Sequence, residues 1–194
     1  MEEVKKLVEK KFDKYPDSIN QLKQAGSDRK YFRFFIGDES YIAVYNHQVR
    51  ENEVFFEMSR HFRKNNIRVP DLIAVSDDKR AYLLSDLGDL SLFDHLVKNR
   101  IDKTPSEKSI EYYKQSLDHL AEMQTVAADG YDYEYTRPVK CFDKNSILWD
   151  LNYFKYYYLL PSHSPFDEYK IQDEFDKLAD YLLEAPSDFF MFRD

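Results

Sequence analysis

The sequence pattern changes near residue 86. Residues 18–85 contain five short runs rich in β-branched and aromatic residues, interrupted by one helical pattern. After the connector Asp86-Leu87-Gly88-Asp89, apolar residues recur mostly at helical spacing. Because strands and helices are segregated along the chain, the sequence predicts an α+β architecture. We expect a strand-rich part over residues 1–86 and a helical part over residues 87–194.

The expected elements follow from these patterns and from proline and glycine stops. Strands are predicted at 18–23, 31–36, 41–45, 72–75 and 81–84, and helices at 2–14, 51–65, 91–97, 106–129, 147–160 and 166–183. The apolar segment 189–194 is predicted to be a further strand.

Composition excludes several classes of function. A net charge of −8 disfavours a partner with a phosphate backbone, and no segment is apolar enough to cross a membrane. The single cysteine, Cys141, fits a reducing compartment, so we expect a soluble cytoplasmic protein without nucleic-acid or membrane partners. His61, His95, His119 and His163 have no metal-ligand spacing with Cys141, so no metal site is predicted.

Five segments together resemble the aminoglycoside/choline phosphotransferase family. In chain order they are GSDRKYFR at 26–33, YIAVY at 41–45, RENE at 50–53, DLGDLSLFD at 86–94 and FRD at 192–194. The first and fourth look most like the amino-sugar branch, the anomeric N-acetylmuramate/N-acetylglucosamine kinases. The resemblance covers almost the whole chain.

The resemblance implies a protein-kinase-like bilobal fold. Residues 1–86 would form the complete small β-rich N-terminal lobe, and residues 87–194 the hinge with a partial helical C-terminal lobe. The implied activity is ATP-dependent transfer of a phosphoryl group to a hydroxyl of a small polar acceptor, an amino sugar, with ATP and Mg²⁺ as cofactors. Phosphoryl transfer requires positioning and charge neutralisation more than covalent chemistry.

The resemblance assigns a phosphate-binding turn to Gly26, Ser27, Asp28 and Arg29. Glycine would allow the backbone to approach the phosphates, and its neighbours would supply backbone N–H groups and a cation. Without the resemblance, the same segment predicts an ordinary hairpin turn.

The charged residues beyond that turn have two interpretations each. Arg33 would point into the nucleotide cleft or lie in solvent. Glu53 resembles the helix glutamate that pairs with a strand lysine, with Glu51 as the other candidate. Tyr45 occupies the lysine position of the V-A-I-K strand motif, so either Arg33 or Arg29 would neutralise the phosphates, or nucleotide binding would be weak. Acidic residues also favour a helix N-terminus without any role in binding.

Asp86 and Gly88 would offer backbone hydrogen bonds to the adenine edge, and the alternative is a simple turn between lobes. In the helical part, Asp150 and Asn152 would bind hydroxyl groups of a sugar. Trp149 or Tyr153 would stack on its ring, and the alternative is that these rings pack in the core.

Asp194 matches the aspartate of the H-R-D catalytic loop, which accepts the proton of the acceptor hydroxyl. Phe192 occupies the histidine position of that motif. The asparagine and aspartate that bind Mg²⁺ would follow residue 194, so we expect this chain to be a fragment without turnover.

Two alternatives to the amino-sugar kinase remain. A kinase-like nucleotide- or partner-binding protein without catalysis would explain Tyr45 and the missing metal ligands. A protein kinase fits less well because the motifs resemble the small-molecule branch. A homodimer that buries apolar surface of the helical part is a further expectation.

Overall fold

The computed structural model describes residues 1–23, 28–100, 104–136, 140–186 and 189–191. The chain divides into two compact units, Met1–Tyr131 and Asp132–Asp194, and each is described by itself. The predicted lobe boundary at residue 86 lies inside the first unit and stays a prediction.

The first unit contains one five-stranded antiparallel sheet with the strand order β1-β2-β3-β5-β4. Its strands are β1 (Ser18–Gln21), β2 (Lys30–Ile36), β3 (Glu39–Tyr45), β4 (Leu72–Val75) and β5 (Ala81–Ser85). The prediction of five strands before residue 86 is therefore confirmed, as is the α+β class. The tight turn between β2 and β3 contains Gly37, which has a φ of +60°.

The described residues of the first unit form four helices. They are α1 (Glu2–Phe12), α2 (Val49–Lys64), α3 (Leu92–Asn99) and α4 (Glu107–Thr125). The serines that precede α3 and α4 accept hydrogen bonds from backbone N–H groups in the first turns of these helices, as N-caps do. α3 and α4 pack against each other.

One face of the sheet packs against α1, and we call it the α1 face. Because strand side chains alternate between the two faces, this face receives every second residue of each central strand. Its core comprises Val4, Leu7 and Val8 of α1 with Phe32, Phe34, Ala43, Ala81 and Leu83 of the sheet, all buried.

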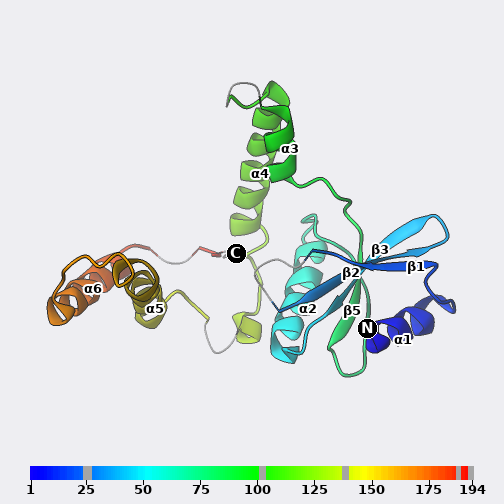
Figure 1. Ribbon diagram of the computed structural model, residues 1–194, viewed down its shortest axis with the longest axis horizontal. Helices are drawn as coiled ribbons and strands as arrows, with labels where there is room; N and C mark the ends of the chain where they lie inside the picture. The colour runs from blue at the N-terminus through cyan, green and yellow to red at the C-terminus, as the bar shows by residue number, and fades with distance from the viewer. Residues whose placement is uncertain (24–27, 101–103, 137–139, 187–188, 192–194) are drawn as a thin grey trace. The chain divides into compact units, whose positions relative to one another are not determined.

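The opposite face packs against α2, and Figure 1 shows α1 and α2 on the two sides of the sheet. We call it the α2 face. It consists of Tyr31, Ile42, Val44, Tyr82 and Leu84, with Phe55 and Phe56 of α2 packed on it. The aromatic pair Phe56–Tyr82 meets edge to face, with ring centroids 5.1 Å apart.

The C-terminal half of α2 contacts the segment that follows α4. Nε2 of His61 lies 2.5 Å from the backbone oxygen of Ala127. The His61 ring also packs on Tyr131 at a centroid distance of 5.1 Å. These contacts join α2 to the end of the first unit.

The second unit is helical. It contains the 3₁₀ turn η1 (Tyr133–Thr136), α5 (Lys144–Phe154), the π-helical turn η2 (Lys155–Leu159) and α6 (Glu168–Leu183). α5 packs against α6. The single helix predicted at 147–160 is therefore an α-helix followed by a π turn. The strand predicted at 189–194 is wrong for residues 189–191, which have no strand structure, and residues 192–194 lie outside the described ranges.

Large apolar side chains of the helices remain exposed in the described part of the chain. On α4, Ile110 and Leu117 are 44% and 63% exposed, and on α6 Leu182 is 46% exposed. No helix within the described ranges is both long enough and apolar enough to span a bilayer.

Candidate functional site

Two arginines, one within β2 and one just before it, lie on the α2 face. In the sheet register, Arg33 is opposite Ile42 and Tyr31 is opposite Val44, and opposite residues of an antiparallel pair share a face. Arg29 directly precedes the strand and continues the same alternation. The sequence therefore places one guanidinium at each end of an apolar surface.

Arg33 binds the segment that follows β5. Its Nε lies 2.5 Å from Oδ2 of Asp86 and its Nη2 lies 3.0 Å from Oδ1, while Nη1 donates to Asp89. The side chains of Arg33 and Asp86 are only 15% and 5% exposed. These hydrogen bonds to Asp86 and Asp89 raise the pKa of Arg33. Of the two interpretations of Arg33, solvation on the strand does not fit this structure.

Asp86 accepts several hydrogen bonds. Burial alone would raise the pKa of its carboxyl, but hydrogen bonds from Arg33, the backbone N–H of Gly88 and Ser40 lower it below its ordinary value. The N–H of Gly88 lies 2.9 Å from Oδ1 of Asp86, and Gly88 has a φ of +89°. That N–H, which the resemblance assigns to the adenine edge, is thus bonded to Asp86 in this structure.

At the other end of the α2 face, Arg29 binds Glu51 in the first turn of α2. Nη2 of Arg29 lies 3.1 Å from Oε2 of Glu51. The same carboxylate oxygen accepts a hydrogen bond of 3.2 Å from Nδ2 of Asn46. Burial alone would lower the pKa of Arg29, but its neighbours Tyr82, Tyr31 and Glu51 together raise it.

Two buried asparagines fix the position of this glutamate. Asn46 and Asn52 are 2% and 0% exposed, and Nδ2 of Asn46 lies 3.1 Å from Oδ1 of Asn52. Nδ2 of Asn52 donates in turn to the backbone oxygens of Asn46 and Lys79, at 3.0 and 2.8 Å. Sequence reasoning missed both asparagines. The sequence signal for them is weak: one asparagine directly follows a strand, and the other lies near the start of the next helix.

Glu53 lies elsewhere on α2. Its carboxylate pairs with Lys79 in the turn before β5, and both side chains are about half exposed. The structure therefore brings Glu51, and not Glu53, to an arginine of the α2 face.

Tyr45 lies on the α1 face, packed against the core around α1. A strand residue on that face cannot reach α2, so the position matched to the motif lysine is directed away from the helix. At this end of β3 the α2 face presents Val44, which carries no charge.

Other predicted residues lie outside the described ranges, at the edge of one, or in the second unit. Gly26, Ser27 and Asp194 lie outside the described residues, and Asp28 is exposed at the start of the described segment. Asp150 and Asn152 belong to α5 in the second unit. Asn152 is half-buried and donates to the backbone oxygen of Leu148 at 2.8 Å.

The rings near these α5 residues are not core residues of the second unit. Trp149 is 74% exposed and Tyr153 is 59% exposed. Tyr153 stacks on Tyr157 with a centroid distance of 4.2 Å. The interpretation of these rings as buried core does not fit the described structure.

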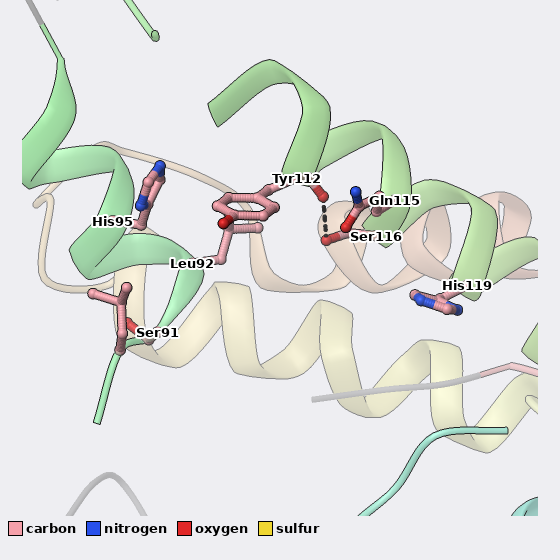
Figure 2. A pocket seen from close by; sticks show the side chains of 8 residues that line it. Ser91, Leu92, His95, Tyr112, Gln115, Ser116 and His119 are labelled. Carbon is pink, nitrogen blue, oxygen red and sulfur yellow. Dashed lines mark hydrogen bonds between the residues drawn. The ribbon is translucent and has the colours of Figure 1, made fainter. Parts of the chain in front are cut away.

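A pocket of about 330 Å³ lies between α3 and α4, just after the segment that Arg33 binds (Figure 2). It is lined by Leu90, Ser91, Leu92, His95, Tyr112, Gln115, Ser116 and His119. His95 packs edge to face on Tyr112, with centroids 4.9 Å apart. In the described part of the chain, no three His, Cys, Asp or Glu side chains are grouped so that they could hold a metal ion.

The fold has a counterpart among solved structures. No protein-family model and no curated protein matches the chain. The crystal structure of a thermostable mutant of aminoglycoside phosphotransferase APH(4)-Ia, in its apo form, is similar to it with a TM-score of 0.55 at 14% identity. The alignment covers 95% of this chain and 61% of that structure, so the chain spans less than two thirds of that protein. The fold of the chain is therefore the kinase-like fold of an aminoglycoside phosphotransferase.

Proposed function

We propose that the chain binds ATP beside the arginines of the α2 face and belongs to a phosphotransferase that acts on a hydroxyl of a small polar acceptor, an amino sugar. The observation that supports this most directly is a pair of arginines on this face, one ion-paired with Glu51 and one with Asp86, in a kinase-like fold. Guanidinium groups suit phosphates.

In phosphoryl transfer the protein mainly positions the reactants and neutralises charge. The phosphoryl group would pass from ATP to the acceptor oxygen, the hydroxyl proton would pass to the carboxylate of Asp194, and ADP would leave. Mg²⁺, when bound, would neutralise charge on the phosphates. Within the described ranges, no group of three His, Cys, Asp or Glu side chains could hold this ion.

A second candidate is a kinase-like binding protein without catalysis. It is favoured by Tyr45, because the β3 position that the motif assigns to lysine carries a phenol directed toward α1. This protein would bind nucleotide and would not transfer phosphate.

Calorimetric titration of the chain with ATP tests the binding step shared by both candidates. Transfer of labelled γ-phosphate to N-acetylmuramate and N-acetylglucosamine is measured in a separate assay. Transfer supports the kinase, binding without transfer supports the second candidate, and the absence of saturable ATP binding overturns both.

A further inference from the structure

The strand lysine of the kinase motif has no counterpart on the α2 face, so another residue must bind the phosphates if the proposed function is correct. We propose that Arg29, held by Glu51, is that phosphate-binding cation, and that Arg33 instead positions the segment after β5. This inference rests on the proposed function and names the residues that would carry it.

The sheet register explains why an arginine next to β2 would take the place of a lysine on β3. Lysine would be needed on the α2 face of β3, but that face presents Val44 there, while Tyr45 is on the α1 side. Tyr31 is the register partner of Val44 on β2. Arg29, two residues before Tyr31, is on the same side of the chain and reaches the N-terminal turn of α2 from the neighbouring strand.

Most donors of Arg33 are already used. Its Nε, Nη1 and Nη2 each donate to a carboxylate of Asp86 or Asp89. Three of its five N–H donors are thus engaged, and the two-point contact to Asp86 fixes the orientation of the guanidinium.

Arg29 retains donors. Its Nη2 is bonded to Glu51 and its side chain also interacts with Tyr31, while its Nε is buried with no hydrogen-bond partner among the described residues. The side chain as a whole is 28% exposed, so part of the guanidinium is open to a ligand. An arginine has five N–H donors, so one can bind a carboxylate while others bind a phosphate.

Glu51 is suited to orient this arginine. Its Oε2 accepts from both Arg29 and Asn46, and Asn46 is itself fixed by the fully buried Asn52. The carboxylate is thereby held at one position in the first turn of α2. Glu53 has no such support, since it pairs with a half-exposed lysine.

The test compares three ligands that differ only in the number of phosphate groups. The affinities of Arg29→Ala and the unaltered protein for adenosine, ADP and ATP are measured by calorimetry. We expect ATP affinity to fall about tenfold to a hundredfold, ADP affinity to fall less, and adenosine affinity to stay unchanged. Arg60→Ala is the matched control, because Arg60 is exposed and pairs with Glu57 on the outside of α2.

A second pair of variants separates the two glutamates. Glu51→Gln removes the charge that orients Arg29 and should weaken ATP binding severalfold, whereas Glu57→Gln on the same helix should not. Glu53→Gln tests the competing assignment. If Glu53→Gln weakens ATP binding and Glu51→Gln does not, the inference is overturned.

Circular dichroism establishes that each variant is folded, and Arg29→Lys replaces Arg29→Ala if the latter unfolds. Lysine keeps the positive charge but lacks the planar set of N–H donors of a guanidinium. The Arg29→Lys variant should therefore bind ATP with intermediate affinity. If the unaltered protein binds ATP and both Arg29 variants bind it equally well, the inference fails while the proposed function stands. If the unaltered protein binds no nucleotide, the proposed function fails first.

Discussion

Arg33 and Asp86 form a two-point contact between β2 and the segment that follows β5, across 53 residues of sequence. Nε and Nη2 of the arginine lie 2.5 and 3.0 Å from the two carboxylate oxygens. Such a fork fixes the orientation of both groups as well as their distance. The segment 86–89 therefore has a defined position on the sheet.

Removing the arginine should destabilise the protein. In Arg33→Ala, the carboxylate of Asp86 stays almost buried without its cation, which should lower the free energy of unfolding by about 2–4 kcal/mol. Arg33→Lys should lose less, because an ammonium keeps the charge but not the fork. Urea denaturation followed by circular dichroism measures both.

The matched control is Arg60→Ala, which breaks an exposed pair within α2 and should change the unfolding free energy by at most about 0.5 kcal/mol. Equal stabilities of Arg33→Ala and Arg60→Ala would contradict the importance of the contact.

The same carboxylate predicts a pH dependence. The pKa of Asp86 is lower in the folded protein than its ordinary value, despite burial, because of its hydrogen-bond donors. A lowered folded pKa stabilises the protein above the unfolded pKa, and this stabilisation is lost as the pH falls through the folded value. Asp86→Asn should therefore lose less stability than the unaltered protein between about pH 5 and pH 2.

Denaturation midpoints across this range measure the difference. Asp89→Asn is the control, since the side chain of Asp89 is 84% exposed and should contribute little. Parallel pH profiles for the unaltered protein and Asp86→Asn would count against the prediction. Other carboxyls with lowered pKa values, such as Asp78 and Asp143, also make stability depend on pH. Their contribution is the same in the unaltered protein and in Asp86→Asn.

Sequence patterns were sufficient for the five strands of the sheet and for the segregation of strands and helices, but they also predicted a strand at 189–194 that residues 189–191 do not form. Local alternation and helical spacing are properties of short segments, so they need no tertiary information. Arg33 and Asp86 became candidates through the family resemblance and not through these patterns.

The faces of the sheet were harder to assign. Alignment of YIAVY with a motif implied that position 45 is directed toward α2, but a shift of one residue turns a strand side chain to the other face. Only the packing of Ala43 and Tyr45 against α1 decides this. The role of the asparagines could not be predicted for a different reason. Asn52 bonds to the backbone of Lys79, which is 27 residues away, and local sequence patterns do not reveal such a contact.

The buried asparagine gives a third prediction. Asn52→Ala removes a buried donor to the backbone oxygens of Asn46 and Lys79 and an acceptor for the Asn46 amide, so the free energy of unfolding should fall by about 2–3 kcal/mol. Asn99→Ala is the control, since that amide donates to a backbone oxygen at an exposed helix end. If chemical denaturation finds the two variants equally stable, the buried network contributes little.

The last prediction concerns the turn between the sheet and α3. Gly88 has a φ of +89°, and a Cβ built there meets no atom within 4 Å. Gly88→Ala should therefore cost about 1–2 kcal/mol through backbone strain alone. Because relief of that strain would move the Gly88 N–H away from Asp86, part of the cost should disappear in the Asp86→Asn background. A double-mutant cycle of unfolding free energies measures this coupling, and strictly additive changes would show that the turn and the carboxylate are independent.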